Sequence, residues 1–526
     1  MVTAARRVRV AGELLFLVAS LWRVAESGHL LVIPVDGSHW LNLKILMDGL
    51  GKRGHDVVVV VPEVSMAMGP SPHFTTKVFP VPYGRDEVEK IKPTIETNMS
   101  FFQRFRGAFG KTRGLRDFFV STCESLLYNT ELMQELGERK FDALLTDPFL
   151  PCGAIVADYL SLPTVNLVRG IPCGLDDAAT QCPKPVSYVP GVFTGNTDKM
   201  NFLQRTKNML FALLDPLLCY LLYSPFEELA ARFLQRDVSL VQLLSQTSIW
   251  LLRYDFILEY PRPLMPNMVL VGGMNCKERK PLPQELEEFV ASSGDHGVVV
   301  FTLGSMVSEI PPVVANHFAE AFGQIPQKVL WRYTGKIPTA LAPNTKLVKW
   351  LPQNDLLGHP KTRAFITHGG TNGIYEAICN GVPSVMIPLF GDQGYNVGHM
   401  VDHGAGIKLD IEHMSSSDLV NAINTVINDA RYKETMMKLS ARHRDRLFEP
   451  IDLSIHWVEF VMKHGAANHL RPAAHDLNWI QYHCLDIIGV LLASFVTSLY
   501  LMIKCCSLCC KRCLCRGRDQ MKRKSD

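Results

Sequence analysis

Runs of apolar residues that do not alternate with polar ones recur along this chain, and they restrict its fold more than any other feature. A strand without alternation is buried on both faces, which is typical of a parallel sheet covered by helices. The amphipathic stretch 38–52 separates the first two runs at helical spacing. A doubly wound α/β domain is therefore predicted, with strands at 30–35, 56–61, 143–146 and 164–168 and a further helix at 153–159.

A second series of the same kind follows the polar, proline-bearing segment 277–283. Two doubly wound sheets in series make a cleft between the domains the expected ligand site. The chain of 526 residues is long enough for both domains. The second series has expected strands at 298–303, 328–332, 346–349, 364–367 and 384–387, and a helix at 419–429.

The two ends of the chain read as targeting segments. Residues 1–27 pass from a basic stretch through an apolar run to small residues, which is typical of a cleaved signal peptide. Residues 487–503 carry no charge and are at the short limit for a membrane span. The basic tail behind them predicts that the tail is cytosolic and the body lumenal.

Charge and cysteine content add further limits. The net charge of +3 is small and its excess lies in the tail, so nothing indicates a nucleic-acid partner. Six of the 14 cysteines crowd the tail, where either acylation or no role is expected, and the scattered others form no disulfide scaffold. Asn98 begins a glycosylation sequon compatible with a lumenal body.

Two apolar stretches leave alternatives open. Residues 101–119 are rich in phenylalanine, and residues 209–223 are almost wholly apolar but interrupted by Asp215 and Pro216. Both are expected to be too short or too interrupted to span a bilayer. They form either an acceptor pocket or membrane-resting surface, or ordinary packed helices.

The segment 364–377 carries the clearest chemistry. A buried strand ends at His368, a glycine turn follows, and a helix begins near Asn372. The free amides at such a helix start suit a diphosphate, and the glycines let it approach the main chain. Glu376 lies one helical turn after Asn372, where its carboxylate is able to accept hydrogen bonds from ribose hydroxyls.

A histidine at a strand end is usually structural, so the order of several motifs carries the inference. Trp350 and Gln353 precede His368, and Asp392-Gln393 follow Glu376. An indole stacks on a base, a glutamine bonds its polar edge, and an Asp-Gln pair holds sugar hydroxyls.

This order resembles the signature of the UDP-dependent glycosyltransferases, and it is most similar to the vertebrate UDP-glucuronosyltransferases whose members share one C-terminal half. The resemblance covers essentially the whole chain. It implies a GT-B fold, in which two Rossmann-like domains face a cleft, plus one C-terminal transmembrane helix. It also implies inverting transfer of glucuronic acid from UDP-glucuronate to hydroxyl, amine or carboxyl groups of small lipophilic acceptors. No Asp-x-Asp cluster is seen on a sugar-side loop, so no metal ion is implied, and no cofactor is expected.

The resemblance gives each segment an expected role. These are a signal peptide (1–27), an acceptor-binding domain (28–276), a linker (277–283), a UDP-sugar-binding domain with return helices (284–484), a transmembrane helix (485–503) and a cytosolic basic tail (504–526). Lys522 and Lys524 resemble the dilysine signal of type I membrane proteins of the endoplasmic reticulum. The family also implies homo- or heterodimers with other members.

The donor-binding residues are likewise implied by the resemblance. Tyr395 departs from the pattern, because many relatives have an acidic residue before Asn396; transfer of glucose, xylose or N-acetylglucosamine is therefore the alternative. The implied contacts are Trp350 for uracil, Gln353 and Glu376 for ribose, Ser305, His368, Gly370 and Asn372 for the diphosphate, Asp392 and Gln393 for the sugar, and Arg262 for a glucuronate carboxylate.

The expected base lies in the first domain. His39 follows the first strand, at the edge where such sheets bind ligands. An imidazole suits general-base work at neutral pH, and it needs a partner that fixes its tautomer. Asp147, after a later strand, matches the family's catalytic aspartate. A non-catalytic lumenal binding or partner subunit of the same fold is the rival interpretation.

Overall fold

The computed structural model describes residues 27–92, 95, 101–307 and 309–522, with the side chains of 101–109 and 513–522 left out. This chain divides into two compact units, Met1–Leu470 and Arg471–Asp526. Almost all of the predicted signal peptide and the sequon at Asn98 therefore lie outside the described residues.

The first half of the larger unit holds a seven-stranded parallel sheet, as the apolar runs predict. Its strand order is β3-β2-β1-β4-β5-β6-β7, so the chain changes direction between β1 and β4. Sheets of this kind bind ligands at that switch point, outside the carboxyl ends of the strands. The strands are β1 (His29–Ile33), β2 (Asp56–Pro62), β3 (Thr75–Phe79), β4 (Ala143–Thr146), β5 (Thr164–Val168), β6 (Ile249–Leu252) and β7 (Met268–Leu270).

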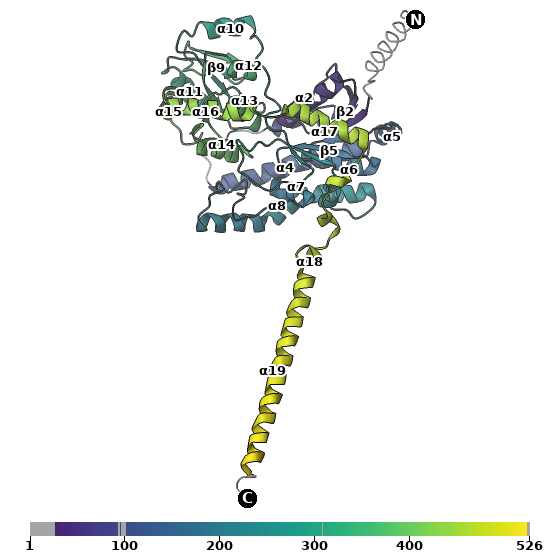
Figure 1. Ribbon diagram of the computed structural model, residues 1–526. Coiled ribbons are helices and arrows are strands. Elements are labelled where there is room, and N and C mark those ends of the chain that lie inside the picture. The colour runs from purple at the N-terminus through teal and green to yellow at the C-terminus, as the bar shows by residue number, and fades with distance from the viewer. Residues whose placement is uncertain (1–26, 93–94, 96–100, 308, 523–526) are drawn as a thin grey trace, which may run out of the picture. The chain divides into compact units, whose positions relative to one another are not determined.

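Helices cover both faces of this sheet (Figure 1). Alternate residues of β1 point to opposite sides, since Leu31 belongs to one core cluster and Leu30 to the other. This explains why neither face of the strand carries polar residues. The helices are α2 (Ser38–Lys52), α3 (Arg85–Lys90), α4 (Phe101–Leu127), α5 (Thr130–Glu138), α6 (Cys152–Leu160), α7 (Leu175–Thr180), α8 (Phe202–Leu234) and α9 (Leu240–Leu244).

The second half repeats the design with a six-stranded parallel sheet. Its order is β10-β9-β8-β11-β12-β13, which places its switch point between β8 and β11. Its strands are β8 (Val298–Thr302), β9 (Lys328–Arg332), β10 (Thr345–Val348), β11 (Thr362–Thr367), β12 (Ser384–Met386) and β13 (Gly406–Lys408). Its helices are α10 (Gln284–Ala291), α11 (Pro312–Phe322), α12 (Gln353–Leu357), α13 (Thr371–Cys379), α14 (Gln393–Asp402), α15 (Ser416–Asn428) and α16 (Ala430–Arg444).

The chain then returns to the first sheet. Helix α17 (Pro450–His464) lies beside α2 (Figure 1), and its residues Ile455, Val458 and Val461 belong to the same core cluster as Leu30. Arg53, the residue that follows the C-terminal end of α2, pairs with Asp452 of α17 at 2.8 Å. A helix that follows the second sheet in the sequence therefore completes the core of the N-terminal domain.

Six of the cysteines outside the tail form three disulfides, a pairing that the sequence spacing did not reveal. They are Cys123–Cys152, Cys173–Cys219 and Cys276–Cys379. Cys182 is buried and free, and Cys484 is exposed and free.

The expected interruption at Asp215 and Pro216 is wrong. Helix α8 continues through Pro216 and Pro225, and it is one of two helices in the described residues long and apolar enough to cross a membrane. Its second part packs ordinarily, because Phe226 and Leu229 are buried in the core. Its first part instead exposes large apolar side chains, including Leu210, Leu213, Leu214 and Leu217.

The smaller unit holds α18 (Trp479–Tyr482) and α19 (Leu485–Lys522). The candidate membrane span is Leu485–Arg512, and its apolar side chains are exposed. A single apolar helix was predicted here at 485–503. The helix is longer because the cysteine-rich and basic residues after Ile503 continue it.

Candidate functional site

The turn between β11 and α13 has the geometry of an anion site. The first bond within α13 runs from the Ile374 N–H to the Gly370 carbonyl at 3.1 Å. The amides before Ile374 therefore have no acceptor in the helix, and they lie at the positive end of its dipole. Asn372 lies in this first turn, and its carbonyl accepts a bond from Asn275 at 3.0 Å.

His368 is packed between two glycines. A Cβ atom at Gly370 or at Gly304 would lie 2.5 Å from its Nε2 atom, so neither position has room for a side chain. Burial, with a smaller contribution from Arg332, lowers the pKa of His368 to about 4 against the opposing effect of Asp392. The imidazole is consequently neutral at neutral pH and acts as a hydrogen-bonding group rather than as a cation.

Glu376 is held in place by two amides. Gln353 donates to its Oε2 at 2.7 Å and Asn275 donates to its Oε1 at 3.1 Å. Burial raises the pKa of Glu376 to about 7, although both hydrogen bonds and Lys277 oppose the shift. The structure thus brings together Gln353 and Glu376, the two predicted ribose contacts, and adds Asn275.

Trp350 follows β10 and leaves 61% of its surface exposed. The Arg332 guanidinium lies over its ring, 5.3 Å from the centroid. The same guanidinium donates to the Gly304 carbonyl and, at 3.2 Å, to the Ser305 carbonyl. Arg332 therefore joins the indole to the turn after β8, and the exposed ring is available to stack on a base.

Asp392 and Gln393 begin α14, and they differ in how they are held. Gln393 is buried, and its Oε1 accepts from the Leu389 and Phe390 amides at 2.7 and 3.0 Å. Its side-chain oxygen is therefore used by the turn. Asp392 has a side chain that is 42% exposed, and its Oδ2 accepts from Thr371 at 3.1 Å.

His39 and Asp147 meet at the switch point of the first sheet. His39 Nδ1 lies 2.6 Å from Asp147 Oδ2, and Asp147 Oδ1 accepts from the Phe149 amide at 3.0 Å. The side chain of Asp147 is 3% exposed and that of His39 is 25% exposed. A carboxylate on Nδ1 fixes the proton there, which leaves Nε2 able to accept a proton.

The two switch points are connected. His39 and Asp147 follow β1 and β4, while Ser305 and His368 follow β8 and β11. A Cβ atom at Gly37, in the turn before His39, would lie 3.5 Å from the Met306 sulfur. The turn that carries the imidazole therefore lies close to the turn that carries Ser305.

Arg253 also joins the halves. It follows β6, is buried, and donates to Asn372 Oδ1 at 2.8 Å. Burial lowers its pKa to about 10, and among the described residues no carboxylate lies within ion-pair distance of it. By contrast Arg262, the residue expected at a donor carboxylate, donates to Asp177, and this partner raises its pKa against the effect of burial.

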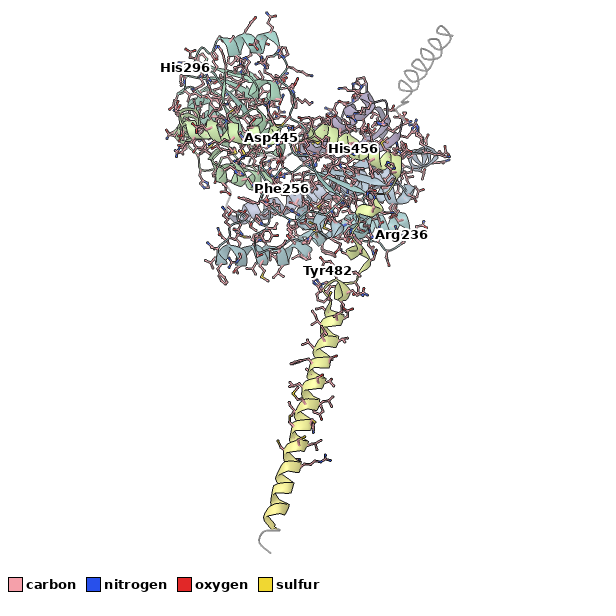
Figure 2. All side chains as sticks on the ribbon, in the orientation of Figure 1. Arg236, Phe256, His296, Asp445, His456 and Tyr482 are labelled. Atoms are coloured by element: carbon pink, nitrogen blue, oxygen red, sulfur yellow. A yellow bond between two sulfur atoms is a disulfide. The ribbon has the colours of Figure 1, made fainter. Side chains whose placement is uncertain are left out.

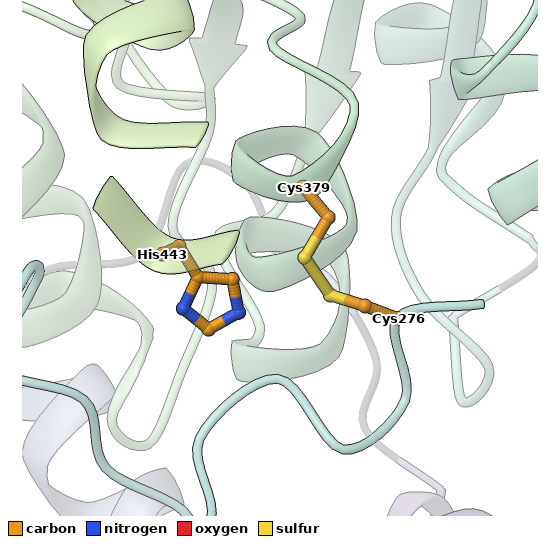
Figure 3. A group of neighbouring side chains, drawn as sticks. All are labelled: Cys276, Cys379 and His443. Carbon is orange, nitrogen blue, oxygen red and sulfur yellow. A yellow bond between two sulfur atoms is a disulfide. The ribbon is translucent and has the colours of Figure 1, made fainter. Parts of the chain in front are cut away.

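A further cluster lies where the linker meets α13. Figure 3 shows His443 beside Cys276 and Cys379, a group with metal-ligand chemistry. The two sulfurs are bonded to each other, so they are not available as ligands. His443 Nδ1 bonds Asp255 and Arg446 lies 3.3 Å from Nε2. The disulfide ties the segment that carries Asn275 to the helix that carries Glu376.

Comparison with known proteins decides the family. The family model described as "UDP-glucoronosyl and UDP-glucosyl transferase" matches residues 28–520. The chain is 53% identical to UDP-glucuronosyltransferase 1A1 of Mus musculus, over 95% of this chain and 94% of the relative. It is 52% identical to UDP-glucuronosyltransferase 1A6 of Homo sapiens, over 98% of each chain. The chain belongs to this family.

Solved structures support the fold of this UDP-glycosyltransferase. The spinosyn forosaminyltransferase SpnP matches with a TM-score of 0.56 at 16% identity, covering 83% of this chain and all of the other (100%). The Os79 protein of O. sativa in complex with UDP matches with a TM-score of 0.55 at 16% identity, covering 82% of this chain and 100% of that one. The predicted fold of two parallel-sheet α/β domains is confirmed.

Several residues of the candidate site were not singled out from the sequence. Arg169, Arg253 and Arg332 each end or follow a buried strand, and Asn275 and Thr371 lie beside recognised motifs. An arginine at the carboxyl end of a parallel strand is a usable sign, since that edge binds ligands. One sequence alone did not distinguish these arginines from surface ones.

Proposed function

We propose that the chain transfers glucuronic acid from UDP-glucuronate to small lipophilic acceptors, with inversion at the anomeric carbon. The His39–Asp147 contact of 2.6 Å, set beside the donor half, is the observation that carries this proposal. Family membership and 53% identity to a UDP-glucuronosyltransferase of Mus musculus support it.

The donor binds against the second sheet in this proposal. Trp350 stacks on uracil, and the amides before Ile374 hold the diphosphate. Glu376 accepts hydrogen bonds from the ribose hydroxyls, and Gln353 donates to the ribose. His368 donates to a phosphate oxygen as a neutral imidazole. As the bond to the sugar breaks, the diphosphate gains negative charge, which the start of α13 stabilises.

The first sheet supplies the base. His39 Nε2 removes the proton of the acceptor hydroxyl while the oxygen attacks the anomeric carbon. Asp147 stabilises the imidazolium that forms, because it is buried and bonded to Nδ1. A single displacement turns an α-linked donor into a β-linked product. No step in this sequence requires a cofactor or a metal ion.

We assign the glucuronate carboxylate to Arg253 in preference to Arg262. Arg262 is already neutralised by Asp177, whereas Arg253 is buried without a carboxylate partner among the described residues. A buried guanidinium gains most from an anionic ligand. In a competition of UDP-glucuronate with UDP-glucose, UDP-xylose and UDP-N-acetylglucosamine, Arg253→Met is expected to lower the preference for UDP-glucuronate. Wild-type preference for a neutral sugar would refute this assignment.

The base is tested with a phenol panel and the release of UDP. We expect His39→Ala to lower turnover about 100- to 10,000-fold, the usual contribution of a general base. Donor affinity should be unchanged, since His39 does not contact the donor. His296→Ala, at an exposed histidine labelled in Figure 2, is the matched control. Donor binding by the wild type without turnover on any acceptor would favour a binding or partner subunit.

The cellular setting is also a proposal. We place the chain in the endoplasmic reticulum membrane as a single-pass type I protein, with both sheets in the lumen. The three disulfides suit an oxidising compartment, and the candidate span precedes a basic tail. Loss of an endoglycosidase-sensitive mass in Asn98→Gln tests the lumenal side. Co-purification of two differently tagged copies tests the proposed dimer.

A further inference from the structure

Arg169 follows β5 and joins the acceptor half to the start of α14. Its Nη2 atom donates to Asn396 Oδ1 at 2.7 Å and lies 2.5 Å from Glu259 Oε1. Its guanidinium lies over the Tyr254 ring, 4.7 Å from the centroid. The side chain is only 11% exposed. Arg169 is thus a buried cation of the first domain that holds an amide of the second.

Asn396, which accepts from Arg169, donates in turn to Asp392. Its Nδ2 donates to Asp392 Oδ2 at 2.9 Å and to the Gly369 carbonyl at 3.1 Å. Thr371 donates to the same Oδ2, and Arg169 Nε lies 3.8 Å from it. Among the described residues, both hydrogen bonds that this carboxylate accepts go to Oδ2. The carboxylate is therefore fixed through one oxygen while the other stays available.

We propose that Arg169 is a positioning residue for the donor sugar: through Asn396 it orients Asp392 so that Oδ1 faces the sugar hydroxyls. This inference rests on the proposed function and on Asp392 as a contact of the donor sugar, the role that the family resemblance implies. A guanidinium is needed, because its Nη2 meets Asn396 and Glu259 while its Nε lies toward Asp392, and a lysine ammonium has no second nitrogen for this. The sugar contact then depends on the two domains being in contact, since Arg169 follows β5 of the first domain and Asn396 lies in α14 of the second.

The kinetic test separates the sugar from the nucleotide. Arg169→Met in the full-length enzyme is expected to raise the KM for UDP-glucuronate about tenfold or more, the usual cost of a lost charge-assisted bond. The Ki of UDP, which lacks the sugar, should change less than about twofold. Arg169→Lys should recover only part of the loss. An equal rise in the KM and in the Ki of UDP would overturn the inference.

Arg169→Met leaves Glu259 buried without its cation, so the protein with both Arg169→Met and Glu259→Gln is measured beside it. This double variant should show the same selective rise in KM if it folds. Arg236→Met is the matched control, because Arg236 (labelled in Figure 2) pairs with Asp158 at 2.6 Å and is 51% exposed. Its kinetic constants should equal those of the wild type.

A double-mutant cycle tests the route through Asn396. If Arg169 acts through it, Asn396→Ala and Arg169→Met should not add in their effects on KM. Additive effects would overturn the inference. Asp392→Asn separates the role of Asp392 at the sugar from the positioning role of Arg169. An unchanged KM for the donor in this variant would refute the proposed role of Asp392. A raised KM in Asp392→Asn with an unchanged KM in the Arg169 variants would refute only the role of Arg169.

Discussion

Replacing Glu376 by glutamine should stabilise the fold and, in the same protein, weaken the binding of the donor. Burial raises the pKa of Glu376 from 4.5 to about 7, so the folded state binds its proton more tightly than the unfolded chain. Stability from this group is fully present below the unfolded pKa of 4.5 and is lost as the pH rises through about 7. Glutamine cannot ionise, so the variant does not lose this stability as the pH rises.

The size of the effect follows from the shift. A difference of about 2.5 between the two pKa values corresponds to about 3 kcal/mol, since one unit is about 1.4 kcal/mol. This is an upper figure, because part of the side chain is exposed and because glutamine keeps only one oxygen to accept from Gln353 and Asn275. At pH 8 the variant should therefore gain about 1–3 kcal/mol of unfolding free energy, and at pH 5 less than about 1 kcal/mol.

The same substitution should have the opposite effect on donor binding, which it weakens. Ribose hydroxyls favour the ionised carboxylate, so the wild type should bind UDP-glucuronate more tightly as the pH rises from 6 to about 7 and then level off. Glu376→Gln should bind about 10- to 100-fold more weakly at pH 8, with little pH dependence. UDP-glucuronate is the better probe, because the terminal phosphate of UDP titrates near pH 6.

Denaturation curves and calorimetric titrations at pH 5, 6, 7 and 8 measure both quantities on the full-length protein in detergent. Glu434→Gln, at an exposed glutamate of α16, serves as the control. A stability difference that is the same at pH 5 and pH 8 would show that Glu376 is ionised in the folded state throughout. Equal donor affinity of the variant and the wild type would remove Glu376 from the ribose site.

Three other variants address the donor half. Gly370→Ala should lower donor affinity about tenfold without a large loss of stability, because its Cβ would displace the His368 ring while the backbone remains allowed; isothermal titration and thermal melting check this. Arg332→Met should weaken UDP binding about tenfold, as the indole and the turn after β8 lose their shared contact, and UDP titration measures it. Serine at both Cys276 and Cys379 should lower unfolding stability by about 2–4 kcal/mol and raise the KM for the donor, and a donor KM unaffected by the change would separate the disulfide from the ribose site.

The fold could be predicted where strands are buried on both faces. The expected bounds of 143–146, 164–168 and 328–332 agree with β4, β5 and β9. Four strands were not predicted. β3 reads Thr-Thr-Lys-Val-Phe at an exposed edge, and β13 has three residues including Gly406. β7 has only three residues and does not stand out from its neighbours. β6 is as long and as buried as β4, so its apolar run was a signal that we missed.

The site could be predicted only as far as local motifs reach. His368, Glu376 and Asp392 were singled out because turns and helix starts bring polar side chains together within a few residues of the sequence. The role of Arg169 or Arg253 depends on a partner from the other sheet, more than 100 positions away in the chain. Arg262 illustrates the opposite case, since a motif singled it out and the structure places it on Asp177.

The return of α17 to the first sheet has a consequence for biosynthesis. Domains of a growing chain usually fold from the N-terminus as they emerge. Here the face of the first sheet that carries Leu30 packs against Ile455, Val458 and Val461. These residues are synthesised only after the whole second sheet. Helix α2 already covers part of this face, so the first domain is left with the part under α17 uncovered during synthesis. Exchanging N-terminal halves between relatives therefore requires that α2 and α17 remain matched.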